Sequence, residues 1–148
     1  MSAMGAAFDA FKALFTADTG VGGLNEPLGD GAAKVHRFVR SRDGASQDAA
    51  NPPTPHIRFE GVMAERDATE VKHASGVVRL FMIADRDQDG AKFDTIDARM
   101  RALYHEATSL AAAGWDFSIP TLIRSTWLSA PGNQARLLQE YRVKATQL

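Results

Sequence analysis

The fold is decided by residues 77–107, which open with the run Val-Val-Arg-Leu-Phe-Met-Ile-Ala at positions 77–84. In a strand, alternate side chains point to opposite faces. One face of this run is then wholly apolar, and the other carries Arg79 as its only charge. A strand that leaves so little for water is typical of the centre of a sheet covered on both sides. We therefore expect the other elements to be arranged around a central strand at 77–84.

The residues after this strand change to a helical pattern. Apolar side chains recur every three or four positions from Phe93 to Ala107, with charged residues between them. Asp89 is expected to cap the start of the helix, and Asp97 with Arg101 forms an i,i+4 pair in the favourable orientation. The pattern predicts an amphipathic helix that packs on the sheet.

Length and composition indicate one ordinary globular domain spanning residues 1–148. A chain of 148 residues buries about two-thirds of the surface that its unfolded form exposes. A net charge of -1 gives no global electrostatic reason to bind nucleic acid or membranes. The absence of cysteine excludes disulfides and thiolate chemistry, and fits assembly in a reducing cytoplasm. The first residues resemble neither a signal peptide nor a membrane span.

The N-terminal half predicts one helix and two strands. Phenylalanines at helical spacing indicate a helix at about 6–17, and a glycine-rich loop at 21–33 follows it. Residues 34–40 and 56–63 read as strands that can pair as a hairpin, and in the second strand His56 is expected to point outward.

The C-terminal half predicts further hairpins. Residues 64–75 form a polar connection that we interpret as a second hairpin turn. Apolar residues then alternate over 115–119, and two closing strands at 122–128 and 137–145 are joined by a turn at 129–133. Grouped helices and clustered hairpins favour an α+β fold, with a mainly antiparallel sheet of about five strands and two main helices packed on it.

Residues 41–55 form a long loop with three prolines and no apolar side chain larger than alanine or proline. Loops of this length are commonly functional or disordered. One interpretation is a tolerated surface insertion, and the other is a segment that becomes ordered on a partner. For the second, the candidate interface residues are Arg42, Asp43, Gln47, Asp48 and Asn51.

The segment Asp85-x-Asp87-x-Asp89-Gly90 matches the first part of an EF-hand calcium loop. The glutamate that should close such a loop is replaced by Ile96, and the preceding element reads as a strand. We therefore interpret the segment as a solvated strand-to-helix turn, with a calcium site formed by Asp85, Asp87 and Asp89 as the weaker alternative.

The sequence contains no recognisable catalytic motif. The four histidines have no metal-ligand spacing, and there is no nucleophile elbow or phosphate-binding glycine loop. Glu65 and Glu70 could be imagined as a general acid and base, but a charged turn contains the same residues without any catalysis. The basic residues near 34–58 have no aromatic side chain on the same outward face on which bases could stack. We expect no catalytic residue, no cofactor and no metal ligand.

The order of elements resembles the tail terminator and minor tail protein family of long-tailed bacteriophages and related gene-transfer particles. The resemblance is carried by the opening helix at 8–15, the strands at 56–61, 76–84 and 140–143, the polar hairpin at 65–69 and the helix at 93–105. It covers nearly the whole chain and consists of an order of elements with scattered apolar positions.

The resemblance implies a structural virion protein without catalysis, assembled in the host cytoplasm. Such a protein forms a ring, expected to be a hexamer, at the head-proximal end of the tail. Its partners would be other copies of itself, the tail tube protein and a head-completion or neck protein, with DNA passing through the ring without sequence-specific binding. The alternatives are another head–tail connector, such as a neck or tail-completion protein, and a small metal-binding α+β domain.

Overall fold

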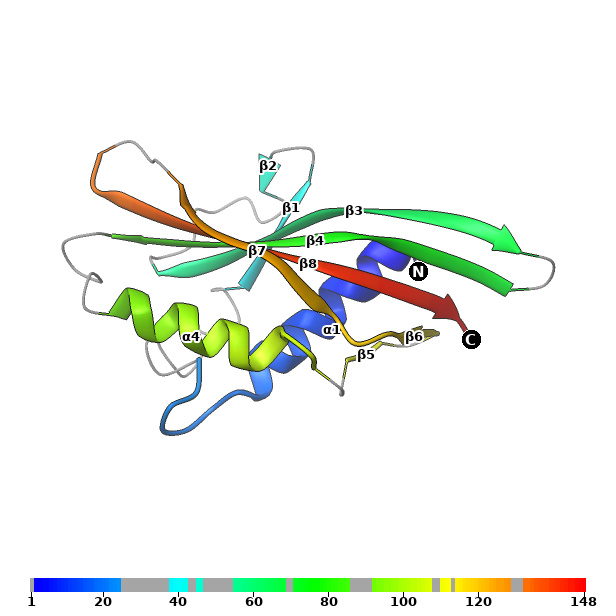
Figure 1. Ribbon diagram of the computed structural model, residues 1–148, viewed down its shortest axis with the longest axis horizontal. Coiled ribbons are helices and arrows are strands. Elements are labelled where there is room, and N and C mark those ends of the chain that lie inside the picture. The colour runs from blue at the N-terminus through cyan, green and yellow to red at the C-terminus, as the bar shows by residue number, and fades with distance from the viewer. Residues whose placement is uncertain are drawn as a thin grey trace.

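The computed structural model describes residues 2–24, 38–42, 45–46, 55–68, 71–85, 92–107, 110–112, 114–128 and 132–148. These residues form two helices and eight strands (Figure 1). The elements are, in chain order, α1 (Ala3–Ala17), β1 (Phe38–Arg42), β2 (Ala45–Ser46), β3 (His56–Ala68), β4 (Val71–Asp85), α4 (Phe93–Tyr104), β5 (Ala111–Ala112), β6 (Trp115–Phe117), β7 (Thr121–Leu128) and β8 (Gln134–Gln147). The expected α+β class and the two main helices are confirmed.

The described strands form one mixed sheet in the order β2-β1-β3-β4-β8-β6-β5, and β7 also pairs with β8. β1 and β3 run parallel, with Phe38 opposite Ile57. The expected hairpin between them and the expected mainly antiparallel sheet of about five strands are therefore wrong. Residues 43–55 separate the two strands, which is about the dozen residues that a parallel connection requires.

β4 is the central strand, as the sequence predicts. It pairs with β3 on one side and β8 on the other over most of its length. On its inner face, which the helices cover, Val78, Leu80 and Met82 are completely buried. On the outer face Val77 and Phe81 are only half-buried. The inner face of β4 is thus completely buried, whereas its outer face is only partly covered.

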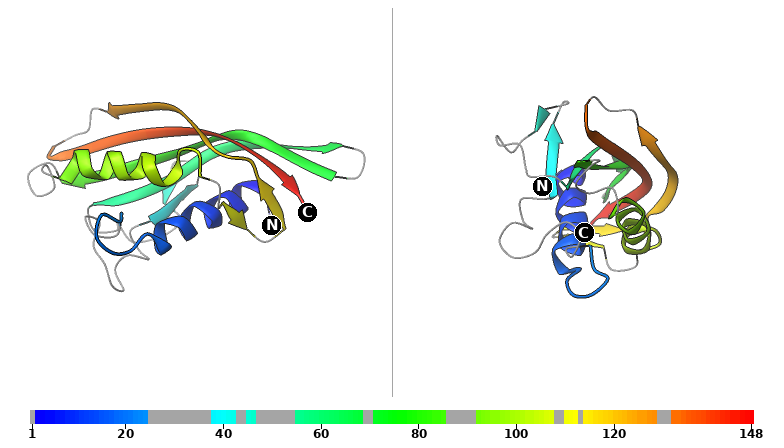
Figure 2. Two further views of the ribbon diagram at one scale, coloured as in Figure 1. Left: turned by 60° about the horizontal axis from the view of Figure 1, so that its bottom comes forward. Right: turned by 90° about the vertical axis from the view of Figure 1, so that its left-hand side faces the viewer.

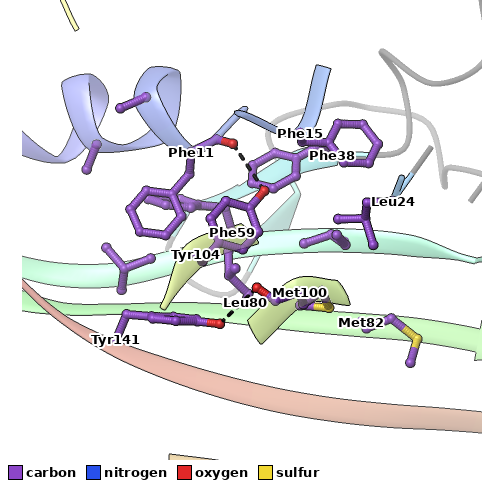
Figure 3. Close-up of a cluster of buried hydrophobic side chains, with 14 of the residues drawn as sticks. Phe11, Phe15, Leu24, Phe38, Phe59, Leu80, Met82, Met100, Tyr104 and Tyr141 are labelled. Carbon is purple, nitrogen blue, oxygen red and sulfur yellow. Dashed lines mark hydrogen bonds between the residues drawn. The ribbon is translucent and has the colours of Figure 1, made fainter. Parts of the chain in front are cut away.

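Both helices cover the inner face of the curved sheet (Figure 2). α1 presents small residues and then large ones to the sheet. Its first half buries Ala3, Ala6, Ala7 and Ala10. Its second half inserts Phe11 and Phe15 into the main core (Figure 3).

Aromatic rings join the two helices to the sheet. The ring of Phe11 stacks on that of Tyr104 from α4, with 5.0 Å between the ring centroids. The Tyr104 hydroxyl donates a hydrogen bond of 3.1 Å to the carbonyl oxygen of Phe11. Phe59 of β3 and Tyr141 of β8 contact the same Phe11 ring from the sheet. This cluster joins α1, α4 and the sheet, because each ring contacts more than one element.

α4 buries the predicted stripe through Ile96, Met100 and Tyr104. The expected ion pair between Arg101 and Asp97 is also present, with a distance of 3.2 Å from Nε to Oδ1. The predicted cap is wrong, because the residue before the helix is Lys92, which makes no side-chain cap hydrogen bond. The predicted cap residue, Asp89, lies outside the described residues. The helix begins at Phe93, the first residue of the apolar stripe, and thus later than predicted.

β3 and β4 form the hairpin predicted at 64–75. The strands extend into the predicted turn, however, as far as Ala68, which pairs with Val71. We call residues 62–68 and 71–77 of this hairpin the arm. Two glycines stand where the arm meets the rest of the sheet. A Cβ added to Gly76 would lie 1.9 Å from the Val62 carbonyl oxygen, and one added to Gly61 would lie 2.3 Å from the Val77 oxygen. Only glycine permits backbones to approach this closely.

The closing strands β7 and β8 pair antiparallel as predicted, with Leu128 opposite Arg136 near their turn. The predicted loop at 41–55 is shorter than expected at its start. β1 extends to Arg42, and β2 pairs with it in the register Ser41 opposite Ser46. None of the described helices is long and apolar enough to cross a membrane.

Candidate assembly surfaces

The acidic segment after β4 is only partly described. Asp85 is the last residue of β4 and is half-buried, opposite Gln134 of β8. Asp87 and Asp89 lie outside the described residues. Within the described ranges, no three histidines or carboxylates come together as a possible metal site. The interpretation of the segment as a solvated turn therefore stays a prediction.

The interface residues suggested for the long loop are also only partly described. Arg42 belongs to β1, where it pairs in register with Ala45. Asp43, Gln47, Asp48 and Asn51 lie outside the described residues. The role of this loop as a contact surface stays a prediction.

The histidines and glutamates that the sequence analysis considered are dispersed. His56, at the start of β3, pairs in register with Ile83 and so lies on the outer face, as expected, but it is only 4% exposed. His73 lies on the arm, 3.3 Å from the Thr146 hydroxyl, whereas the Nδ1 atom of His105 accepts a hydrogen bond from the backbone of β7. Glu65 accepts a hydrogen bond of 3.2 Å from the backbone nitrogen of Ala3, at the start of α1. His36 and Glu70 lie outside the described residues. No described pair of these groups forms an acid and base site.

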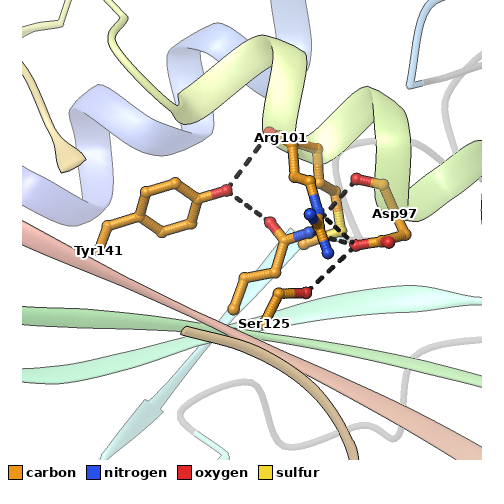
Figure 4. A network of polar contacts seen from close by, with 6 residues as sticks. Asp97, Arg101, Ser125 and Tyr141 are labelled. Atoms are coloured by element: carbon orange, nitrogen blue, oxygen red, sulfur yellow. Dashed lines mark hydrogen bonds and ion pairs between the residues drawn. The ribbon is translucent and has the colours of Figure 1, made fainter. Parts of the chain in front are cut away.

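A buried polar network links α4 to β8 (Figure 4). The Gln139 side chain is completely buried, and its amide donates a hydrogen bond of 2.7 Å to Asp97 Oδ1. The Tyr141 hydroxyl has one proton to donate, and two acceptors lie within its reach, Gln139 Oε1 and, at 3.4 Å, the Met100 carbonyl oxygen. Burial raises the pKa of Tyr141 above its ordinary value, which keeps the phenol a neutral donor. These groups satisfy one another, so the network positions the helix on the sheet.

A second polar contact joins the end of α1 to α4. Arg99 pairs with the Asp18 carboxylate through Nε at 2.8 Å and through its terminal nitrogen, and the Leu24 backbone nitrogen donates to the same carboxylate. Burial by itself would raise the pKa of Asp18. The hydrogen bonds from Arg99 and Leu24 and the charge of Arg99 outweigh it and lower that pKa below its ordinary value.

A row of alternating charges crosses the outer face of the sheet. Strand register places Glu60 of β3, Arg79 of β4, Glu140 of β8 and Arg124 of β7 side by side. Arg124 contacts Glu140 at 2.6 Å, and Arg79 contacts the same carboxylate at 3.9 Å. Cross-strand pairs of opposite charge stabilise neighbouring strands. No signal in the sequence marks this row, because its members come from four separate strands.

An apolar surface follows β7 and the residues before it. Ile119, Ile123 and Trp127 are 52%, 41% and 46% exposed. Trp127 is held by Phe93 of α4, with 5.3 Å between the ring centroids. Among the described residues, β7 pairs only with β8, so its other edge has no described strand beside it. An exposed strand edge with apolar side chains is a common site of protein association.

A hollow of about 300 Å³ lies on the outer face of the arm and the adjacent end of β8. We call it the basic groove. Strand register sets two rows of side chains across it, from β3, β4 and β8 in turn. The side chains that line it on the outer face are Ala64, Arg66, His73, Ser75, Lys144 and Thr146. No signal in the sequence marked this surface, because Arg66 and Lys144 are 78 positions apart.

The complete fold is shared with a protein of known structure. A chain from a structure described as the virion of a native gene transfer agent particle matches this one with a TM-score of 0.72. The match covers 99% of each chain at 12% sequence identity. No protein-family model matches the sequence, and no curated protein does. At this identity, the likeness establishes a common fold over the whole chain.

Proposed function

We propose that this protein is a structural component of a phage-like virion. The observation that carries the proposal is the match over 99% of both chains to a protein of a gene transfer agent virion. A match of this extent includes the arm, both helices and the closing hairpin, and it therefore goes beyond a shared sheet. An assembly role also fits the exposed apolar side chains along β7.

Within the virion, the role we propose is that of the tail terminator. The order of elements resembles that family, and the protein would form a ring, expected to be a hexamer, on the last ring of the tail tube. It would stop tube growth there and offer its other side to a head-completion or neck protein, with DNA passing through the centre. A head-to-tail ring needs two different contact surfaces on each subunit. The β7 edge and the arm are two such surfaces on different parts of the molecule.

We also propose that the protein has no catalytic activity. Support comes from three of the described polar clusters, whose side chains are occupied by contacts inside the fold. Asp97 and Gln139 join α4 to β8, Asp18 and Arg99 join the two helices, and Glu140 joins three strands of the sheet. A reacting site needs convergent polar groups that remain accessible to a substrate.

The test is tube growth in a purified system. The tail tube protein of the same particle is polymerised alone, with this protein, and with an equal amount of an unrelated protein of similar mass. We expect this protein alone to shorten the tubes and to add ring-shaped density at one end in electron micrographs. Unchanged tube lengths with bare ends would contradict the proposal.

The same fold likeness also supports another head–tail connector, because the matched chain comes from a complete virion. Sedimentation with isolated heads and with isolated tails separates the two roles. A terminator sediments with tails that lack heads, whereas a neck protein sediments with DNA-filled heads that lack tails.

A further inference from the structure

The outer face of the arm and the adjacent end of β8 is cationic over three consecutive rows of side chains. Strand register aligns Val62, Val77 and Arg142 in the first row, Ala64, Ser75 and Lys144 in the second, and Arg66, His73 and Thr146 in the third. Arg66, Arg142 and Lys144 are all exposed. We call these three rows the cationic patch. Its second and third rows line the basic groove.

The positive charge of the cationic patch is not cancelled by its surroundings. None of the residues in the three rows is acidic. The next row along the strands is the row of alternating charges, in which Glu140 already contacts two arginines. Asp116 of β6, opposite Thr146, borders the patch with one negative charge. The chain has a formal net charge of −1, so the three cations of the patch leave −4 for all other residues. This asymmetry favours an anionic ligand at the patch.

The side chains of the cationic patch suit phosphate groups better than they suit a protein surface. Arginine, lysine, serine and threonine are among the side chains that contact DNA phosphates. The apolar members of the patch are only alanine and valine, and it lacks the tryptophan or tyrosine that commonly anchors a protein contact. It also lacks an aromatic ring on which a base could stack, so contacts to nucleic acid would be made to the backbone.

The dimensions of the cationic patch match the spacing of charge on a DNA duplex. Four residue steps along the strands give a length of about 13 Å, and two strand spacings give a width of about 10 Å. A duplex carries one phosphate per about 1.7 Å of its axis, so about eight phosphates lie within that length. Both helices lie on the inner face of the sheet and leave this outer face uncovered (Figure 2). A duplex can therefore approach the patch and present phosphates to it whatever its base sequence.

We propose that the cationic patch binds the phosphate backbone of double-stranded DNA without sequence preference. The inference rests on the proposed ring, through whose centre the DNA passes, and it assigns the outer face of the arm to that DNA. Each subunit of a ring offers its patch to the same duplex, so individually weak contacts act together. Phosphate contacts of this kind let a protein slide along DNA. Among the described residues, the arm part of β3 pairs only with β4, so its other edge remains for a neighbouring subunit.

Binding of a fluorescent duplex of mixed sequence, followed by anisotropy at several salt concentrations, tests the proposal. We expect the unaltered protein to bind at low salt and to lose affinity as salt rises. Arg142→Gln/Lys144→Gln should weaken binding at least about tenfold at low salt. It should also lower the slope of log affinity against log salt by about 2 per bound subunit, one for each phosphate contact removed.

The matched control is Lys92→Gln/Arg101→Gln, which removes the same charge from exposed positions at α4, on the inner side of the sheet. It should bind the duplex within about twofold of the unaltered protein, because neither residue belongs to the patch. Thermal melting of each variant, expected to stay within about 2 °C of the unaltered protein, separates a loss of binding from misfolding.

Poly-glutamate distinguishes DNA from an acidic protein surface as the ligand. Its charges are roughly 3.3 Å apart along one extended chain, so its charge density is about half that of a duplex. At equal total charge it should displace the fluorescent duplex at least about threefold less well than unlabelled duplex does. Poly-glutamate that competes better than the duplex would assign the patch to an acidic protein and overturn the proposal.

Cross-linking tests the same contact inside DNA-filled particles. The chain has no cysteine, so a photoreactive group can be attached at Ser75→Cys alone. Illumination should link this position to DNA. The same group at Thr95→Cys, on the exposed side of α4, is the control and should remain unlinked.

The results separate the DNA contact from the proposed ring. Salt-dependent binding that is lost in Arg142→Gln/Lys144→Gln and kept in the control supports the contact, even where tube growth contradicts the ring. An unaltered protein that caps tail tubes but does not bind the duplex at low salt overturns the contact and leaves the ring intact. Equal loss of binding in both double variants also overturns the contact. A protein that neither caps tubes nor binds the duplex overturns both.

Discussion

The two ends of the β3 and β4 pair differ in what their inner faces bury. Beneath the helices, Phe59 and Leu80 pack among aromatic rings from both helices and from β8. Beyond Gly76, in the arm, the buried inner residue is Ala74, which packs with small residues at the start of α1 and with Trp115. The same two strands thus provide a stabilising core at one end and a thin, polar arm at the other. We call the part of the sheet that lies beneath the helices the body. The difference indicates that stability depends mainly on the body, which leaves the arm available for contacts.

The largest loss of stability is expected at the centre of the body. Tyr104 is completely buried, stacks on Phe11 and donates a hydrogen bond to the Phe11 carbonyl oxygen. Tyr104→Ala should lower the free energy of unfolding by about 3 to 5 kcal/mol, as other large-to-small core changes do. Urea denaturation followed by circular dichroism measures this change. A loss below about 1 kcal/mol, typical of a surface position, would mean that the body is not the stabilising region.

The junction between body and arm should be the next most sensitive position. Gly76→Ala brings a methyl group against the Val62 backbone, and we expect it to cost about 1 to 3 kcal/mol through displacement of the two strands. Ser75→Ala, one residue away and exposed, is the control and should leave the unfolding free energy nearly unchanged. Equal effects from both substitutions would show that the close approach at Gly76 has no energetic importance.

The Asp18 to Arg99 contact should give a smaller, pH-dependent effect. Asp18→Asn is expected to cost about 1 to 2 kcal/mol near pH 7, a value reduced from that of buried charged hydrogen bonds because the Arg99 side chain is 35% exposed. Folding lowers the pKa of Asp18, so its contribution is complete above the ordinary value of 3.8 and is lost as the pH falls through the folded pKa. The difference between the two proteins should therefore shrink in strong acid.

Urea denaturation of both proteins at several pH values between about 2 and 7 measures this trend. Asp9→Asn, at an exposed position of the same helix, is the control. If the difference in unfolding free energy between the unaltered protein and Asp18→Asn stays constant down to the lowest pH, the ionised Asp18 carboxylate is not the source of the stabilisation.

The smallest effect on stability is expected in the arm itself. Val62 is 67% exposed on the outer face of β3, so Val62→Ser should change the unfolding free energy by less than about 0.5 kcal/mol. Thermal melting of the free protein measures the change. A loss comparable to that of Gly76→Ala would mean that the arm is packed more firmly than its exposure indicates.

The body of the fold follows from local pattern. Period-two alternation predicts β4, and helical spacing predicts both α1 and the stripe of Ile96, Met100 and Tyr104. These signals succeed because each residue's environment is set mainly by which face of its own element it occupies. The turn residues between β7 and β8 are likewise a local signal, and the predicted hairpin is present.

The features that the sequence did not predict depend on residues far apart in the chain. The parallel pairing of β1 with β3 leaves no mark in either strand. Gln139 is buried because Asp97 and Tyr141 satisfy it, and Asp97 lies 42 positions away in the sequence. The basic groove and the charge row are surfaces assembled from three and four strands. The candidate contact residues of the long loop stay a prediction.

Amide hydrogen exchange in the free protein and in the protein bound to tail tubes tests most directly whether the protein assembles through its periphery. We expect slower exchange on binding in the arm, in β7 and in the end of β8 beside the basic groove, while the already protected backbone of β4 under the helices changes little. Protection that is unchanged in the arm and in β7 while the protein is demonstrably bound to tubes would contradict the account.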